Sequence, residues 1–421
     1  MSTQTKSQSN DDENDDPTTL TDTSSPSTNN DTTKPHVIIA GAGIMGCATA
    51  YYLARDFGVA STLVDPSGRI APAASGKAGG FLSLDMNDHS PVGPLARRSF
   101  ALHQELDNEL PDPIDYRRVT CAAIGVGQRT PSKPQGQKLK GIEWAEGARG
   151  VQPLGDESTT AQVHPDKLCQ ALWRQTQQLA PGCRLVQGRV VGPLLEKSED
   201  DTRDQRKMVM TGAEILVQDD DDDTTTSTTI PGTKLVYASG PWTSSAMTGV
   251  KYHSVVVPTP TVLTQCVFFS GLGDPEVYVR PDQTAYCTGF PDNPVRVTER
   301  PGEEVVRPEK VQQILDAVRQ TSNLVLDNDG DDGSTNNDNN DNNDMITQSC
   351  YLPCTPDGLP FLGQWEADHS YVVTGHSCWG ILMGPASGES LAHLIVTGRS
   401  PHVDLTPFDP HRLGHMNMLE N

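Results

Sequence analysis

Residues 36–46 read His-Val-Ile-Ile-Ala-Gly-Ala-Gly-Ile-Met-Gly, and this stretch decides the fold. The apolar run 36–40 predicts a short buried strand, and a helix is expected to follow the three glycines and continue to about Phe57, ending at Gly58. A second apolar run, 60–65, ends in Asp65. Strand, helix and strand together form a βαβ unit of about thirty residues with a GxGxxG loop at its first turn.

The spacing of these glycines suits a loop that binds the pyrophosphate of a dinucleotide. Gly41 allows a sharp turn out of the strand, Gly43 lets the backbone approach the phosphates, and Gly46 lets the helix pack closely on the sheet. The helix N-terminus adds free N–H groups and partial positive charge. Asp65 can accept hydrogen bonds from ribose hydroxyls and disfavours a phosphorylated ribose, so NADP is not expected. The motif alone leaves both FAD and NAD open.

Length and charge limit the classes of protein that fit. A chain of 421 residues exceeds what one compact core normally supports, so two domains are expected. Most of the net charge of -23 falls in three polar segments, 1–34, 199–223 and 327–344. Nucleic acid and anionic membranes repel such a chain, so neither is an expected partner. Segment 1–34 has too few apolar residues to offset the entropy of ordering and is expected to be disordered.

The cysteines and the chain start point to an intracellular setting. The nine cysteines are scattered without a CxxC pair, which indicates free thiols in a reducing compartment. No apolar run reaches transmembrane length, and the first residues form neither a signal core nor a basic presequence. We therefore expect a cytoplasmic protein without membrane insertion. Cys350, Cys354 and Cys378 lack a zinc spacing with a histidine pair, so no metal site is predicted.

The rest of the chain alternates helical and extended patterns. Helices are predicted at 93–110, 166–179 and 307–322, and strands at 184–191, 208–217, 234–238, 254–270, 276–280 and 284–290. A loop of small residues is expected at 71–80, and a long, flexible hairpin loop after Gln218.

A second glycine-rich turn stands near the end of the chain. A strand at 371–374 runs into Gly375-His-Ser-Cys-Trp-Gly380 and then a helix to about Val396. A helix N-terminus can stabilise negative charge on a reduced flavin, and a simple NAD dehydrogenase has no need of this second element. The segment therefore favours FAD.

Together these motifs resemble the D-amino-acid oxidase superfamily of FAD-dependent oxidoreductases, which includes glycine oxidase and monomeric sarcosine oxidase. The similarity is strongest to a eukaryotic branch of that superfamily and covers residues 35–410 apart from the acidic inserts. It rests on the GAGIMG loop, Asp65, Ala74-Ser-Gly-Lys-Ala-Gly-Gly80, Ala238-Ser-Gly-Pro-Trp242, Tyr351-Leu-Pro-Cys-Thr-Pro-Asp-Gly358 and the stretch 374–388.

The resemblance implies an α/β fold, α+β overall, in which a Rossmann-type FAD-binding domain is joined to an antiparallel-sheet substrate domain. The FAD-binding domain is expected to comprise 35–115, 160–250 and 346–410, with a low-complexity insert at about 199–229. The substrate or cap domain would comprise 116–159 and 251–326, and an Asn/Asp-rich insert would span 327–345.

The resemblance also assigns contacts to FAD. The glycine-rich loop would meet the pyrophosphate, Asp65 the adenosine ribose, and the loop of small residues and the last helix the flavin. The residues expected to contact FAD are Gly41, Ala42, Gly43, Ile44, Met45, Gly46, Asp65, Ser75, Gly76, Lys77, Ala78, Gly79, Val190, Gly240, Gly380, Ile381 and Leu382. Cys350 stands where monomeric sarcosine oxidase binds FAD covalently; a buried free thiol is the alternative.

The catalytic residues depart from the pattern. Amino-acid-oxidising relatives hold the substrate carboxylate with an arginine where this chain has Leu352, so the usual anchor is missing. Arg280 is a candidate replacement, or else a surface arginine at a strand end. Lys77 is a candidate for oxygen activation or anion binding, or else an exposed loop lysine. His376 is expected either to face the substrate or to cap its turn.

These features predict an FAD-dependent oxidoreductase that oxidises the C–N bond of a small amine or amino-acid-like substrate by hydride transfer to the flavin, with oxygen as acceptor. Two alternatives stay open. One is a catalytically idle flavoprotein that serves as a binding or regulatory module, which the missing arginine would fit. The other is an NAD-dependent dehydrogenase, which would be colourless and bind NADH.

Overall fold

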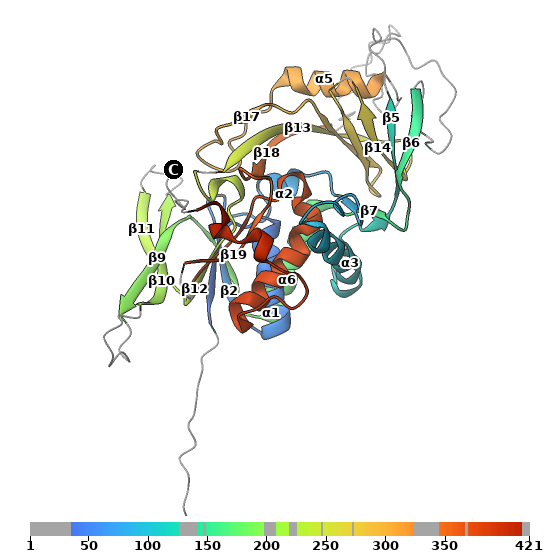
Figure 1. Cartoon of the computed structure of the whole chain (residues 1–421). Helices are drawn as coiled ribbons and strands as arrows, with labels where there is room; N and C mark the ends of the chain where they lie inside the picture. The colour runs from blue at the N-terminus through green and yellow to red at the C-terminus, as the bar shows by residue number, and fades with distance from the viewer. Residues whose placement is uncertain are drawn as a thin grey trace, which may run out of the picture. The chain divides into compact units, whose positions relative to one another are not determined.

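The computed structural model describes residues 35–125, 142, 144–145, 149–197, 208–218, 225–245, 247–271, 273–320, 322, 345–366 and 369–414. The predictions for 1–34, for 199–207 and 219–224 of the first insert, and for 327–344 of the second lie outside these residues. Figure 1 shows the described elements coloured along the chain.

The predicted βαβ unit forms the centre of a six-stranded sheet. Strand β1 (Val37–Ala40) enters helix α1 (Ile44–Phe57) through the glycine loop, and β2 (Ser61–Asp65) returns parallel to β1. The order β19-β20-β12-β1-β2-β8 adds β8 (Arg184–Gln187), β12 (Lys234–Tyr237) and β20 (Ser370–Thr374) in parallel and β19 (Phe361–Glu366) as an antiparallel edge. Both central strands are wholly buried, as parallel strands covered on two faces are.

Helices cover one face of this sheet. The predicted helices are confirmed as α3 (Gly93–Glu109), α4 (Pro165–Leu179) and α6 (Gly380–Thr397), and α1 packs against both α4 and α6. Figure 1 shows α1 and α6 side by side. Their approach is close because Gly388 faces α1: a Cβ on this glycine would lie 2.5 Å from the carbonyl carbon of Ala48.

A three-stranded antiparallel sheet covers the opposite face. It comprises β9 (Arg189–Lys197), β10 (Met208–Gln218) and β11 (Thr225–Pro231). The single strand predicted at 184–191 is two strands, because Gly188 at φ 157 lets the chain leave one sheet and enter the other.

The Thr-rich part of the predicted hairpin loop is a strand in the structure and not a loop. Residues 225–229 belong to β11 and pair with β10, so this part of the expected flexible loop is regular structure. Threonine is β-branched and favours an extended backbone. The prediction of a flexible loop relied on the low-complexity composition and did not use this preference.

A second large sheet is called the cap sheet below. Its order is β17-β13-β16-β15-β14-β5-β6, and β18 (Ile346–Cys354) pairs with β13. The other strands are β5 (Thr120–Gly125), β6 (Arg149–Gly155), β13 (Thr248–Pro258), β14 (Gln265–Ser270), β15 (Glu276–Val279), β16 (Thr284–Gly289) and β17 (Pro294–Val295). All neighbours are antiparallel except β5 and β14.

The cap strands place alternate side chains on opposite faces of the sheet. Val277 and Val279 of β15 pack in the core beneath helix α5 (Pro308–Arg319), together with Ile314 of that helix. Glu276 and Tyr278, which alternate with these valines, point to the other face, which lines a cavity. Figure 1 shows α5 above the sheet.

The predicted strand at 254–270 is β13 and β14, separated around Pro258 and Pro260, which cannot donate to a sheet. Within the expected loop 71–80 the structure has one helical turn, α2 (Ala74–Lys77). A small sheet of β3 (Phe81–Ser83), β7 (Thr160–Gln162) and β4 (Arg117–Arg118) follows it.

The chain crosses repeatedly between the two large sheets. Strand β18 lies in a segment that the sequence assigned to the FAD-binding domain, yet it pairs with β13 of the cap. Strand β13 itself begins before residue 251. The division into two domains at the predicted boundaries stays a proposal.

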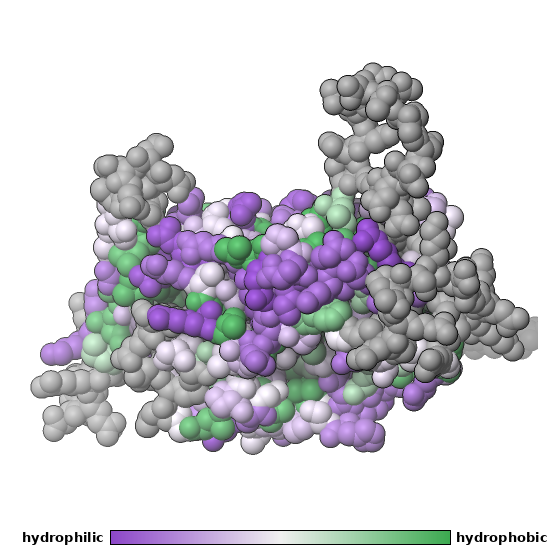
Figure 2. Space-filling model, turned by 90° about the horizontal axis from the view of Figure 1, so that it is seen from above, coloured by the Kyte–Doolittle hydropathy of each residue, from purple (hydrophilic) through white to green (hydrophobic). Residues whose placement is uncertain are grey.

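Seen from above, the coloured surface is a mixture of hydrophilic residues and small hydrophobic groups (Figure 2). Among the described residues, no helix combines the length and apolar character needed to cross a membrane.

Candidate active site

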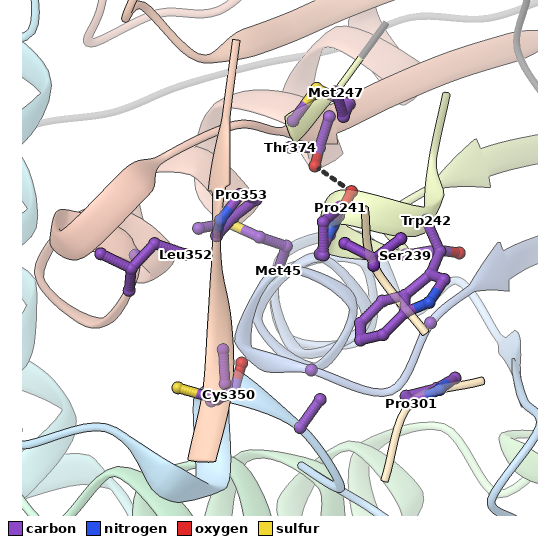
Figure 3. A pocket seen from close by; sticks show the side chains of 18 of the residues that line it. Met45, Ser239, Pro241, Trp242, Met247, Pro301, Cys350, Leu352, Pro353 and Thr374 are labelled. Atoms are coloured by element: carbon purple, nitrogen blue, oxygen red, sulfur yellow. Dashed lines mark hydrogen bonds between the residues drawn. The ribbon is translucent and has the colours of Figure 1, made fainter. Parts of the chain in front are cut away.

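A cavity of about 1510 Å³ is lined by residues of both large sheets. Ligand pockets typically have volumes of about 300–1,000 Å³, so this space can hold a dinucleotide and a small second molecule together. One end is formed by the β1–α1 loop and the ends of β2 and β9, and the other by the cap sheet and the start of α6. Figure 3 shows part of its wall.

The glycine loop gives the first end its affinity for phosphate. Gly41, Gly43, Ile44 and Met45 line the cavity at the N-terminus of α1. The Ile44 N–H donates to Ser75 Oγ at 2.9 Å, and no described residue accepts a hydrogen bond from the Met45 N–H. Free amides at the positive end of a helix fit the pyrophosphate of FAD.

Gly46 supports this loop without lining the cavity. A Cβ on this residue would lie 2.1 Å from the carbonyl oxygen of Gly41, a non-bonded distance that real Cβ atoms essentially never show. Gly41 itself has φ 109, which side chains disfavour. The loop therefore keeps its course only because both residues are glycine.

Asp65 lies at the end of β2, where its carboxylate is nearly buried. Oδ2 accepts from the Ala42 N–H at 3.1 Å, and Oδ1 accepts from the Ser67 N–H and Oγ at 3.0 and 2.6 Å. Asp65 and Val190 both line the cavity. This arrangement fits the predicted ribose and adenine contacts of FAD.

The loop of small residues lies against the cap sheet. Ser75, Ala78 and Gly79 line the cavity, whereas Gly76 packs against Ala71, where a Cβ would meet the Ala71 carbonyl oxygen at 2.3 Å. A Cβ on Gly79 would lie 2.0 Å from a ring carbon of Tyr278. The path of the loop past Ala71 therefore requires glycine at 76, and the close approach of the loop to the cap sheet requires glycine at 79.

Lys77 is held outside the cavity. Its Nζ lies 3.0 Å from Oε2 of the buried Glu304 and donates to the carbonyl oxygen of Ser349 at 3.1 Å. Lys77 is not among the lining residues. The geometry supports neither the expected place beside the flavin nor the alternative of an exposed loop lysine, because the ammonium finds its partners in the cap segment.

Arg280 is also absent from the residues that line the cavity. It is buried, and its Nη2 donates to the carbonyl oxygen of Ala78 at 3.0 Å, with the guanidinium 5.6 Å from the centre of the Tyr286 ring. Burial lowers the pKa of Arg280. Since its side chain does not line the cavity, the geometry does not support the expected role as carboxylate anchor; Arg280 fastens the α2 loop to the cap.

His376 does line the cavity, at the turn before α6. Its Nε2 lies 2.9 Å from Ser387 Oγ, and its buried Nδ1 has no partner among the described residues. Burial lowers the pKa of His376 to about 3, so the ring is neutral at physiological pH. Gly380 and Ile381 line the same end. Leu382 does not, and its carbonyl oxygen lies 3.2 Å from Nε2 of His103.

Cys350 lines the cavity from β18 (Figure 3). Burial raises the pKa of its thiol to about 12, so the thiol is protonated in this structure. Leu352, the residue at the position of the missing arginine, lines the same wall. Gly240 also lines the cavity, and its carbonyl oxygen accepts from Thr374 Oγ1 at 2.8 Å (Figure 3).

The cap sheet contributes lining residues that the sequence analysis missed. They are polar or aromatic and lie on one face of three neighbouring strands: Tyr252, Glu276, Tyr278, Tyr286 and Thr288. The signal was the alternation Glu276-Val-Tyr-Val279, with valines toward the core and polar groups toward the other side. Which strand lies beside which was not visible in the sequence.

Comparisons with known proteins agree with this geometry. A model of the DAO family, described as FAD dependent oxidoreductase, matches residues 36–394. An oxidoreductase of Schizosaccharomyces pombe is 29% identical over 405 residues, which cover 89% of this chain and 97% of that protein. Glycine oxidase of Bacillus licheniformis is 24% identical over 387 residues, which cover 85% and 92%.

The fold is similar to that of glycine oxidase from Geobacillus kaustophilus, with a TM-score of 0.66 and 21% identity over 91% of this chain and all of that one. The predicted fold class and FAD cofactor are confirmed, and the NAD-dependent dehydrogenase is set aside. Because the family model spans most of the sequence, this chain belongs to the DAO family of FAD-dependent oxidoreductases.

Proposed function

We propose that this enzyme oxidises the C–N bond of a small amine or amino-acid-like substrate and that oxygen is the final acceptor. The observation that carries the proposal is the shared cavity, in which a dinucleotide loop at one end and the polar face of the cap at the other enclose one space. The similarity to glycine oxidase in both sequence and fold supports the same class of reaction.

Bound FAD would supply the two-electron acceptor for the hydride of the carbon that bears nitrogen; a substrate that loses this hydride and a proton becomes an imine. Water hydrolyses the imine to a carbonyl compound and ammonia, or to a smaller amine where the nitrogen of the substrate is substituted. Oxygen takes up the two electrons and two protons and leaves as hydrogen peroxide.

The protein itself has to bind the cofactor, orient the substrate and exclude water. We assign FAD binding to the lining residues of the glycine loop, to Asp65 and to the start of α6, with Ala42, Gly46 and Gly76 in support. Neutral His376 would offer a hydrogen bond inside the cavity without adding charge. The stacked rings of Tyr278 and Tyr286, whose centres are 5.8 Å apart, would keep water from the reacting atoms.

Anaerobic mixing of the yellow holoenzyme with a panel of primary amines, secondary amines and amino acids tests this function. At least one compound is expected to bleach the flavin absorbance, and readmitted oxygen is expected to restore it with one peroxide formed per turnover. A bound flavin that no member of the panel reduces would instead support the idle flavoprotein, the alternative that the absence of an arginine at Leu352 favours.

We further propose that the enzyme works in the cytoplasm, in keeping with its nine free cysteines. Imaging of a tagged full-length chain tests this location, and a tag confined to an organelle would contradict it.

A further inference from the structure

We propose that the substrate end of the cavity recognises a small cationic amine that carries no carboxylate, and that Glu276 is the residue that binds its ammonium group. The inference rests on the proposed amine oxidation and specifies the class of substrate. In relatives that hold a substrate carboxylate, a positively charged arginine binds a negative group. Here a negatively charged residue would bind a positive group.

The position of Glu276 follows from strand alternation and register. Glu276 and Tyr278 occupy the cavity face of β15, and Glu276 pairs with Thr288 of β16. Tyr278 pairs with Tyr286 in the same register, and the Tyr278 hydroxyl donates to the Glu276 carboxylate. One carboxylate oxygen is thereby oriented, and the group is fixed on a sheet rather than on a loop.

The charge around Glu276 is uncompensated by the protein. Among the described residues no lysine, arginine or histidine forms an ion pair with it, and the charged neighbour that acts on it is another carboxylate, Asp274. Burial raises the pKa of Glu276, because removal from water disfavours the negatively charged carboxylate. A bound cation would remove this penalty, and a bound carboxylate would increase it.

Neighbouring side chains suit a cation as well. Tyr252, Tyr278 and Tyr286 line the same end, and aromatic ring faces attract ammonium groups. Other lining residues from β18 and the turn before α6 add no positive charge: Leu352 is apolar, Cys350 is a neutral thiol and His376 is a neutral ring. The basic candidates Lys77 and Arg280 are engaged outside the cavity.

Arg296 is the competing candidate for a carboxylate anchor. It lines the rim of the cavity on the exposed segment after β17, beside Glu299. If Arg296 served as the anchor, the enzyme would prefer acids or amino acids, and its loss would weaken them. The two residues therefore make opposite predictions for matched ligands.

The test measures binding rather than turnover. The holoenzyme is titrated anaerobically with n-butylamine, benzylamine, butyrate, benzoate and glycine, and binding is read from the shift of the flavin spectrum and of Tm. We expect the two amines to bind and the two acids not to. Glu276→Gln is expected to weaken the amines by about tenfold or more, Glu276→Asp to retain part of the affinity, and Arg296→Gln and Glu299→Gln to change it little.

Three outcomes would overturn the inference: acids binding as well as amines, amine affinity unchanged in Glu276→Gln, or no amine binding at all. Flavin content and Tm of each variant show whether it is folded, and the preference of the unmodified enzyme for amines over acids tests the idea without any variant. Amines that bind through Glu276 but never reduce the flavin would contradict the proposed oxidation and leave this inference intact.

Discussion

The two ends of the cavity are built in different ways. The nucleotide end is made largely of backbone from one stretch of chain, 41–45, with Asp65 close behind it in sequence. The substrate end is made of side chains from β13, β15, β16 and β18, which strand pairing brings together. Binding of a phosphate by backbone tolerates few residue types, whereas a sheet face accepts any side chain that alternates toward it.

This difference predicts where substitutions act. Changes in the glycine loop should remove the cofactor, and with it every activity. Changes on the cap face should alter the choice of substrate while the cofactor stays bound.

The largest effect is expected from Gly46→Ala. The added Cβ would lie 2.1 Å from the Gly41 carbonyl oxygen, so the loop or α1 must shift. Overpacking of this kind costs about 1–3 kcal/mol, and we expect purified protein with less than about a tenth of the normal flavin, since phosphate binding needs the loop in place. Absorbance at the flavin band relative to protein measures this.

Gly192→Ala in β9 is the matched control, because within the described part of the chain no atom beyond its two sequence neighbours lies within 4 Å of the added Cβ. It should keep full flavin content. Normal flavin in both variants would contradict the idea that close packing at Gly46 shapes the phosphate site.

The same contrast explains what the sequence could predict. Gly41, Gly46 and Asp65 were identifiable because their roles depend on backbone conformation within one βαβ unit. The sequence suggested Lys77 as a residue beside the flavin and Arg280 as a carboxylate anchor, but the direction of a long side chain depends on tertiary partners: the carboxylate of Glu304 and the carbonyl of Ala78.

Glu276 shows the opposite case. Its strand was predicted, and its alternation with buried valines was readable, yet its place in the cavity depends on β15 lying between β14 and β16. Pairing between strands separated in sequence leaves no local pattern, which is why the cap face was missed while the cap sheet itself was expected.

Arg280→Met sharpens the comparison, because Arg280 belongs to the cap but holds the flavin loop. Loss of the hydrogen bond leaves the Ala78 carbonyl without this donor, and we expect FAD affinity to fall by about tenfold. KM for an amine substrate should stay within about twofold. Titration of apoprotein with FAD and steady-state kinetics at saturating FAD give the two values; a raised KM with unchanged FAD affinity would restore Arg280 as a substrate anchor.

A smaller effect is expected on the free energy of unfolding at acid pH. It depends on His103, a residue of α3 whose ring faces α6. Its Nε2 faces the carbonyl oxygens of Ile381 and Leu382, and burial lowers its pKa to about 4 from an ordinary value of 6.5. The unfolded chain therefore binds the proton more readily. The stabilisation is fully present above about pH 6.5 and is lost as pH falls toward 4, by up to about 3 kcal/mol.

Urea unfolding at pH 7.0 and 5.0 measures this loss. In His103→Gln, which can still donate to the carbonyls, the difference in unfolding free energy between the two pH values should be smaller. An identical pH dependence in both proteins would assign the acid sensitivity to His164, whose pKa burial also lowers to about 4, and to other groups.

The smallest effect is expected from Cys350→Ala. This variant tests whether the cap sheet holds the cofactor by a covalent bond in addition to the contacts at the nucleotide end. A thiolate is the form that could attack the flavin, and burial raises the pKa of the Cys350 thiol to about 12. The nearby Lys77 ammonium lowers it less than burial raises it, and that ammonium is already paired with Glu304. We therefore expect the enzyme to release all its flavin on acid precipitation, with and without the substitution. Yellow colour that stays in the pellet of the unmodified protein and is lost in Cys350→Ala would show a covalent bond, and would mean that the bound cofactor changes the ionisation of this thiol.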